Sequence, residues 1–233
     1  MTRIGFATIA ESPRDDVVPA MLELLPSSVV AVERGCLDGR TSDQIAALGP
    51  NDGEVGIVAR LKNGGSTLLS HSKILPIMQQ KVDELVNDEG AELIVILCGA
   101  DWSTVKSEQL IVNPGRVFPG VVSSLAYGRR LGIIKPSGGQ IEQERARYAA
   151  LGIDATVTAA SPYAGEERLT LAAAAATQIR DAGCDLVWMT CIGMDVAMRD
   201  TVAEITRKPT MLAQALLARV VAELLPQRAA VFA

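Results

Sequence analysis

The chain has 233 residues, of which 48% are hydrophobic and 3% aromatic, which allows one large domain or two small ones around a core of aliphatic residues. A net charge of −5 without a basic block argues against a nucleic-acid partner, and no apolar run reaches the ~18 residues of a membrane span. The N-terminus lacks a signal-peptide pattern and the four cysteines show no short-range pairing, so we expect a cytoplasmic protein in a reducing compartment.

The first half of the sequence alternates strand and helix patterns. Short apolar runs indicate strands, and apolar residues at helical spacing indicate the helices between them. The segment Asn63-Gly64-Gly65 is a hairpin signal, so the two strands beside it are expected to pair antiparallel. The expected strands are 3–8, 29–32, 53–61, 66–69 and 92–97, and the expected helices are 14–25, 41–48 and 72–87.

The second half repeats this plan more compactly. Its first strand carries Gly132, as the first strand of the chain carries Gly5, and two of its helices end at Gly152 and Gly183. Glycine is the usual residue at such helix ends. The expected strands are 131–135, 156–159, 185–190 and 210–212, and the expected helices are 139–151, 166–182, 195–205 and 214–225.

Two cysteines lie in near-duplicate settings. Residues 88–98 read DEGAELIVILC and residues 181–191 read DAGCDLVWMTC, so a glycine precedes an apolar run that ends on a cysteine in both. The spacing from Gly90 to Cys98 equals the spacing from Gly183 to Cys191. Since ligands bind outside the carboxyl ends of parallel strands, we expect the two thiols to face one another across a cleft.

These patterns predict an α/β fold of two similar lobes, with mainly parallel sheets flanked by helices and an active-site cleft between the lobes. The first repeat is longer than the second, which we attribute to an insertion near residues 41–71. We expect the first lobe over residues 1–114 and the second over 115–210. The remaining segment, 211–233, is expected to form a C-terminal helix that packs back on the first lobe.

The facing thiols allow three interpretations, two chemical and one structural. A thiolate on one side and a thiol on the other would remove and return a carbon-bound proton without a cofactor or a metal. One thiol would otherwise act alone, as a nucleophile or a proton donor. The third alternative is that Cys98 and Cys191 are simply small buried residues. Cys36 and Cys184 lack the strand-end setting and are expected to be structural, and the only histidine, His71, is expected to start a helix.

Residues beside the predicted strand ends suit a carboxylate ligand. Small residues follow both cysteines, and their N–H groups would bind an anion, especially if a helix begins there. The hydroxyls of Thr8 and Ser12 and the guanidinium of Arg14, at the end of the first strand, form a second group that would bind a carboxylate. The same segment also fits an ordinary helix capped by Ser12. Arg60 either points into the cleft or is solvated. The expected substrate-binding residues are Thr8, Ser12, Arg14, Arg60, Gly99, Ala100, Pro136, Ser137, Ser161, Tyr163, Ile192 and Gly193.

With two α/β lobes that each present a cysteine, the chain resembles the aspartate/glutamate racemase superfamily, which includes amino-acid racemases, hydantoin racemases, maleate isomerases and arylmalonate decarboxylases. More closely, and over nearly its full length, it resembles the AroM protein family. The segments that carry this resemblance are IGFATI (4–9), RLKNG (60–64), LCG (97–99), GIIKP (132–136) with Gln140, ASPY (160–163), CIGM (191–194) and LARVVAEL (217–224).

The superfamily resemblance implies that Cys98 and Cys191 are an acid/base pair, with nearby N–H groups and Thr or Ser hydroxyls holding a substrate carboxylate. The racemases usually carry Asn-Thr after the first cysteine and Thr-His or Thr-Glu after the second. This chain has Gly99-Ala100 and Ile192-Gly193 instead, so the side chains that assist amino-acid racemisation are missing. Arg14 and Arg60 would compensate by holding a more acidic substrate without an amino group.

The predicted function is therefore a cofactor-independent racemase or isomerase that acts on a small carboxylic acid with two cysteines. The alternatives are a single-thiol isomerase or decarboxylase, and a carboxylate-binding protein without turnover. The sequence leaves a homodimer open.

Overall fold

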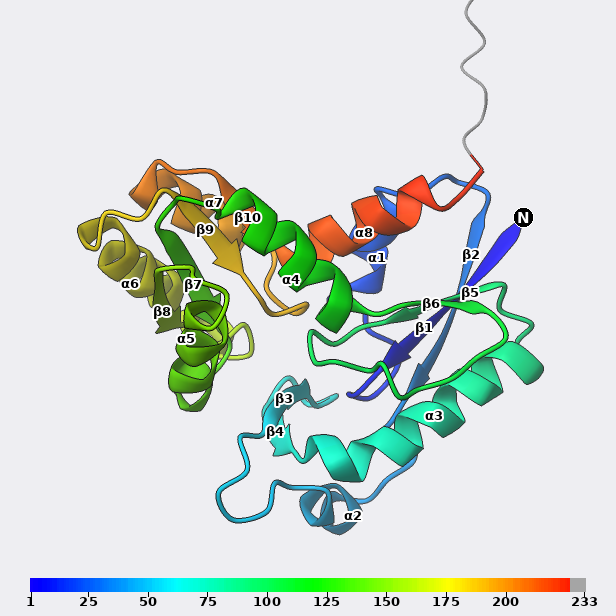
Figure 1. Ribbon diagram of the computed structural model, residues 1–233. Helices are drawn as coiled ribbons and strands as arrows, with labels where there is room; N and C mark the ends of the chain where they lie inside the picture. The colour runs from blue at the N-terminus through cyan, green and yellow to red at the C-terminus, as the bar shows by residue number, and fades with distance from the viewer. Residues whose placement is uncertain (227–233) are drawn as a thin grey trace, which may run out of the picture.

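The computed structural model describes residues 1–226 and has the α/β architecture expected from the sequence, with two parallel sheets flanked by helices (Figure 1). The first lobe holds a four-stranded sheet in the order β2-β1-β5-β6, and the second holds a four-stranded sheet in the order β8-β7-β9-β10. The strands are β1 (Thr2–Thr8), β2 (Val29–Gly35), β5 (Leu93–Ile96), β6 (Leu110–Val112), β7 (Leu131–Lys135), β8 (Ala155–Ala159), β9 (Leu186–Met189) and β10 (Thr210–Leu212).

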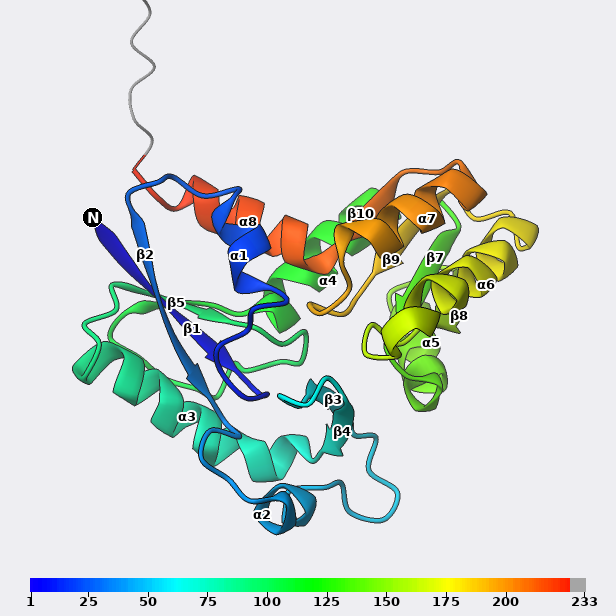
Figure 2. The same cartoon turned by 180° about the vertical axis from the view of Figure 1, so that it is seen from behind.

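Helices cover both faces of each sheet (Figure 1, Figure 2). In the first lobe α3 packs on one face, and α1 and α8 lie over the other. In the second lobe α6 and α7 share one face, and α4 and α5 share the other. The helices are α1 (Val18–Leu22), α2 (Ser42–Ala47), α3 (His71–Asn87), α4 (Pro114–Leu125), α5 (Ile141–Ala149), α6 (Arg168–Asp181), α7 (Val196–Thr206) and α8 (Ala213–Glu223), with short 3-10 turns at Gly138–Gln140 and Gly165–Glu167.

The two sheets repeat one another in register. In each lobe the glycine of the central strand lies opposite the second residue of the strand that leads to the cysteine, in the pairs Gly5–Ile94 and Gly132–Val187. Cys98 is the fourth residue after Ile94, and Cys191 is the fourth after Val187. The equal spacing seen in the sequence therefore places the two thiols at equivalent edges of the two sheets.

The glycines of the central strands allow a helix to lie close to each sheet. A Cβ atom on Gly132 would lie 2.5 Å from Cγ2 of the buried Ile179 in α6, and a Cβ on Gly5 would lie 3.1 Å from Cβ of Leu85 in α3. Separations below 3.0 Å are not tolerated without a shift of the neighbour. Glycine in a strand often marks such a close approach.

Gly132→Ala is expected to lower the free energy of unfolding by about 1–3 kcal/mol, because overpacking displaces α6 from β7. Denaturant unfolding measures this. The matched control is Gly120→Ala, since Gly120 is an exposed residue of α4 with open space around its Cβ position. That variant should gain roughly 0.5–1 kcal/mol, because glycine is unfavourable inside a helix. Equal effects of both substitutions would contradict the packing argument.

The segment after β1 differs from the sequence prediction. The expected helix over residues 14–25 begins only at Val18, and Ser12 does not cap it. The Ser12 hydroxyl instead donates to Asp38 at 2.6 Å, and the Arg14 N–H donates to Glu33 at 2.7 Å. These long-range bonds hold the segment in a loop, which buries Arg14.

Two elements were not expected from the sequence, the strand β6 and the helix α4 that follows it. The pair corresponds to β10 and α8 at the end of the second lobe. Helix α4 packs on the opposite lobe, where the ring of Phe118 lies 5.0 Å from the ring of Trp188 in β9. Helix α8 lies beside α1 of the first lobe (Figure 1, Figure 2). Each lobe therefore sends its last helix onto the other.

A β-hairpin of the first lobe reaches the second lobe. Strands β3 (Ile57–Arg60) and β4 (Ser66–Leu69) pair antiparallel, which confirms the expected hairpin. The amide of Gln140 donates to the Gly56 carbonyl at 3.0 Å across the two lobes. The hairpin belongs to the stretch predicted as an insertion, and the sheet of the second lobe has no such hairpin among residues 1–226.

The last expected domain segment, 211–233, is described as far as residue 226. It contains the end of β10 and all of α8, whereas residues 227–233 lie outside the described part. Within residues 1–226, no helix is both long enough and apolar enough to cross a membrane.

Candidate active site

A cleft of about 550 Å³ is lined by residues of both lobes, and both Cys98 and Cys191 face it. Cavities of this size hold small organic molecules. Nine of the residues predicted from the sequence line it: Arg14, Cys98, Gly99, Ala100, Pro136, Tyr163, Cys191, Ile192 and Gly193. Thr8, Ser12, Arg60, Ser137 and Ser161 do not.

The two cysteine-bearing turns lie next to one another. A Cβ atom on Gly99 would lie 3.6 Å from the carbonyl oxygen of Thr190, the residue that precedes Cys191. The thiols are also near enough for the charge of Cys191 to raise the pKa of Cys98. No helix begins directly after either cysteine, because turns follow both and α7 starts at Val196.

Burial raises the pKa of the Cys98 thiol to about 11. Three donors or cations oppose this shift: the N–H of Ala100, the indole of Trp102 and the ammonium of Lys135. The indole Nε1 of Trp102 is buried and has no hydrogen-bond partner among residues 1–226. Cys98 is therefore protonated in the resting protein but is surrounded by groups that favour its thiolate.

Burial also raises the pKa of Cys191 above its ordinary value. The N–H of Gly193 opposes this shift most strongly, followed by the charge of Arg14 and the hydroxyl of Tyr163. Glycine is required at position 193, because a Cβ there would overlap the Tyr163 hydroxyl. The same hydroxyl accepts a hydrogen bond from Arg14 at 3.4 Å, so a chain of donors runs from the guanidinium to the thiol.

Tyr163→Phe is expected to slow alkylation of Cys191 by iodoacetamide at pH 8 roughly tenfold. Loss of the phenol removes a donor to the thiolate, which raises the thiol pKa by about one unit at nearly unchanged side-chain volume. Peptide mapping after timed alkylation gives the rate at each cysteine. Tyr148→Phe is the matched control, since Tyr148 lines the same cleft without contributing to either thiol pKa. Equal slowing in both variants would contradict the role of Tyr163.

The two arginines predicted to hold the substrate are engaged by one internal carboxylate. Arg14 is bidentate to Asp16, with both N–O distances 2.8 Å, and Arg60 lies 3.8 Å from the same carboxylate. Arg14 also donates to Thr8 at 3.1 Å and to Tyr163. Four of its five N–H donors are thus used within the protein. Burial lowers the pKa of Arg14, but the bond to Asp16 and the charges of Tyr163, Asp16 and Cys191 together outweigh this effect and raise the pKa above its ordinary value.

Three of the other predicted residues outside the cleft, Thr8, Ser12 and Ser161, have structural partners. The Thr8 hydroxyl accepts the Ala10 N–H at 3.2 Å besides the bond from Arg14, and Ser12 is bound to Asp38. The Ser161 hydroxyl accepts the Tyr163 N–H at 3.2 Å and fixes the loop that carries this tyrosine. The hydroxyls of Thr8 and Ser161 therefore orient Arg14 and Tyr163, which line the cleft.

The structure adds a polar wall that the sequence analysis did not identify. Lys135 ends β7, and its ammonium lies 3.2 Å from the carboxylate of the buried Glu144 on α5. Arg147 lies 3.9 Å from the same oxygen. The amide oxygen of Gln140 is buried without a hydrogen-bond partner in the described part of the chain. The helical spacing of Gln140, Glu144 and Arg147 was the only signal of this wall in the sequence.

Another part of the cleft lining is apolar. It is formed by the hairpin segment with Val55, Ile57 and Val58, and by the paired rings of Phe118 and Trp188. His71, which begins α3 as expected, also lines the cleft, and its ring nitrogen lies 3.1 Å from the Asp101 carbonyl. Within residues 1–226 no three His, Cys, Asp or Glu side chains cluster in a way that could hold a metal ion.

Solved structures define the class of fold. The chain is similar to glutamate racemase of Francisella tularensis in complex with D-glutamate (TM-score 0.57, 12% identity, 96% of this chain and 80% of that one). It is also similar to aspartate racemase of Picrophilus torridus (0.56, 10%, 96% and 94%) and to arylmalonate decarboxylase (0.58, 11%, 95% and 91%). The molecule thus has the two-lobed α/β fold of the aspartate/glutamate racemases.

A family model narrows this class. The model described as AroM protein matches residues 4–225, and the chain belongs to the AroM family. Comparison with curated proteins gives no match. The family model confirms the resemblance to AroM inferred from the sequence, and the solved structures confirm the fold that the superfamily resemblance implies.

Proposed function

We propose that this protein is a cofactor-independent enzyme of the racemase or isomerase type, which acts on a small carboxylic acid with Cys98 and Cys191 as its acid/base pair. The observation that carries the proposal is the placement of the thiols. They follow equivalent strands of two repeated sheets and face one cleft, and a backbone N–H beside each thiol favours its thiolate. A proton donor and a proton acceptor must both reach one substrate, and this arrangement allows it.

The proposed reaction is a proton transfer at the carbon next to the carboxylate. One cysteine, as the thiolate, takes the proton from one face of that carbon, and the electron pair passes into the carboxylate as an ene-diolate. The other cysteine, as the thiol, gives its proton to the opposite face and becomes the thiolate. The enzyme ends with its proton on the first cysteine, so the next turnover runs in the reverse direction or follows proton exchange with water.

Backbone groups of the two turns would stabilise the developing negative charge. The N–H groups of Gly99 and Ile192 have no hydrogen-bond partner among the described residues, and both residues line the cleft. Preorganised donors of this kind usually contribute the largest part of such a rate enhancement. They substitute here for the polar side chains that are missing after each cysteine.

A single-thiol reaction is the second candidate, because the two thiols have different surroundings. Cys191 has Tyr163 and Arg14 beside it, whereas Cys98 has Trp102. In a decarboxylation, the bond to a carboxylate breaks, carbon dioxide leaves, and one thiol gives its proton to the resulting carbanion. One of the two cysteines would then be dispensable.

The test begins with a thermal-shift screen of small carboxylic acids, since a ligand of the native state raises its melting temperature. Each acid that binds is then incubated with the protein in D₂O and followed by NMR. We expect deuterium to appear at the carbon next to the carboxylate. A ligand that binds without exchange or product would show a binding protein, and release of carbon dioxide would show the second candidate.

A further inference from the structure

Lys135 is a cation that acts on both thiols. Its charge lowers the pKa of Cys98 and the pKa of Cys191, whereas the charge of Arg14 acts on Cys191. The side chain is only 15% exposed and lines the cleft from the end of the central strand β7. A cation near both thiols is also near any substrate atom that lies between them.

The ammonium of Lys135 is held in place but retains free donors. Its one hydrogen bond among residues 1–226 goes to Glu144, and an ammonium group has three N–H donors. Glu144 is 6% exposed and is shared with Arg147, so two cations surround one carboxylate. This group has a net positive charge of about one and two donors left for a ligand. Arg14, in contrast, spends nearly all of its donors on the protein.

We propose that Lys135, held by Glu144, binds an oxygen of the substrate between the two thiols and restricts the substrate to acids without an amino group on the reacting carbon. This inference rests on the proposed function, because it places the reacting carbon between Cys98 and Cys191. The substrate class is a small carboxylic acid with a second acceptor oxygen, supplied by a hydroxyl, a keto group or another carboxylate.

The exclusion of amino acids follows from charge. An amino acid carries an ammonium on the carbon that would lie between the thiols, and this charge would face the ammonium of Lys135 at short range. A hydroxyl or carboxylate oxygen at the same place would accept a hydrogen bond from Lys135 instead. The missing polar side chains after each cysteine agree with a site built for a different substituent.

A pair of alkylating reagents tests the first half of the proposal without a known substrate. Iodoacetate carries a carboxylate next to its reactive carbon, and iodoacetamide is its neutral isostere. Peptide mapping gives, at Cys98 and at Cys191 separately, the ratio of the iodoacetate rate to the iodoacetamide rate. In Lys135→Met this ratio should fall about tenfold relative to the wild type, and in Lys135→Arg it should stay within about threefold.

Lys208→Met is the matched control, because Lys208 is exposed and does not line the cleft. Its rate ratio should equal that of the wild type. A ratio that is unchanged in Lys135→Met would overturn the proposal, and so would an equal fall in the control. A fall of the ratio in Lys135→Met identifies charge attraction, because a distorted site or a raised thiol pKa would slow both reagents alike.

The exclusion of amino acids is tested with malate and aspartate. Malate carries a hydroxyl on the carbon where aspartate carries an ammonium, and the two acids are otherwise the same. By calorimetry we expect malate to bind the wild type at least tenfold more tightly, and Lys135→Met to remove this preference. Equal binding of the two acids would overturn the substrate class. Binding of neither acid at about 10 mM would also overturn it, because a Kd above ~1 mM is weak for a specific site. Preference for malate without deuterium exchange would contradict the proposed function only.

Discussion

Cys98→Ser and Cys191→Ser are each expected to abolish deuterium exchange into the substrate. A positioned proton donor or acceptor contributes about 10²–10⁴-fold to such a rate, and a serine hydroxyl is too weak an acid to replace a thiol in either role. Serine has nearly the shape of cysteine, so the turns around each residue should persist. NMR of the substrate in D₂O, at equal concentrations of folded protein, measures the loss.

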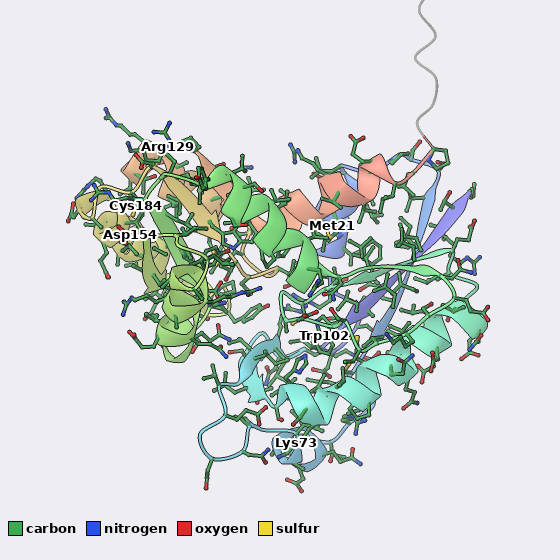
Figure 3. The ribbon with its side chains drawn as sticks, in the orientation of Figure 1. Met21, Lys73, Trp102, Arg129, Asp154 and Cys184 are labelled. Atoms are coloured by element: carbon green, nitrogen blue, oxygen red, sulfur yellow. The ribbon has the colours of Figure 1, made fainter. Side chains whose placement is uncertain are left out.

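The matched control is Cys184→Ala, which removes a thiol outside the cleft. Cys184 is buried in the core of the second lobe, and Figure 3 shows it at the outer end of that lobe, away from Trp102. Exchange by this variant should equal that of the wild type. If one of the two serine variants keeps full exchange, the paired mechanism is contradicted and the single-thiol candidate remains.

The free energy of unfolding is expected to fall as the pH rises from about 8.5 to 11. Burial raises the pKa of Cys98 to about 11, whereas an unfolded cysteine has a pKa of about 8.5. The unfolded chain therefore loses its proton first, and between these values the native state binds more protons than the unfolded state. Stability from this thiol is complete below the unfolded pKa and disappears as the pH passes the folded pKa, a change of about 3 kcal/mol.

Urea unfolding at several pH values measures this slope, and Cys98→Ala identifies the part that comes from this thiol. Burial also raises the pKa values of Cys191, Cys36 and Tyr163, so the variant should have a shallower slope rather than none. A variant as steep as the wild type would show that Cys98 titrates at its ordinary pKa. The exchange rate should rise over the same pH range, since the free protein holds both thiols protonated at neutral pH.

The thiols and the fold were predictable because their signals are local. A glycine, an apolar run and a cysteine recur within eleven residues, and sheet register converts this repeat into two facing positions. Lys135 was not predictable in the same way, although it ends a correctly expected strand. Its importance depends on Glu144 in a different element and on Cys98 in the other lobe, and no short pattern contains all three.

The errors along the chain have similar causes. The loop at Arg14 has the apolar spacing of a helix, but bonds to distant residues such as Glu33 and Asp38 hold it open. The strand β6 has only three residues, which give a weak periodic signal. The internal repeat would have predicted β6 and α4. A strand and a helix were expected at the end of the second lobe, and the repeat implies an equivalent strand and helix at the end of the first.

The exchange of helices α4 and α8 has a consequence for the origin of the site. A half-chain that ended after its own last helix would lack the sheet on which this helix packs. The half-chain's own sheet would also lose the cover that the last helix of the other half provides in the present chain. Two identical half-chains would satisfy both needs as a domain-swapped dimer with two-fold symmetry. The symmetry axis of that dimer would pass between its two thiols, one from each copy. In the present chain the two halves differ around this axis, with Tyr163 beside Cys191 and Trp102 beside Cys98, so two similar halves can give their cysteines unequal tasks.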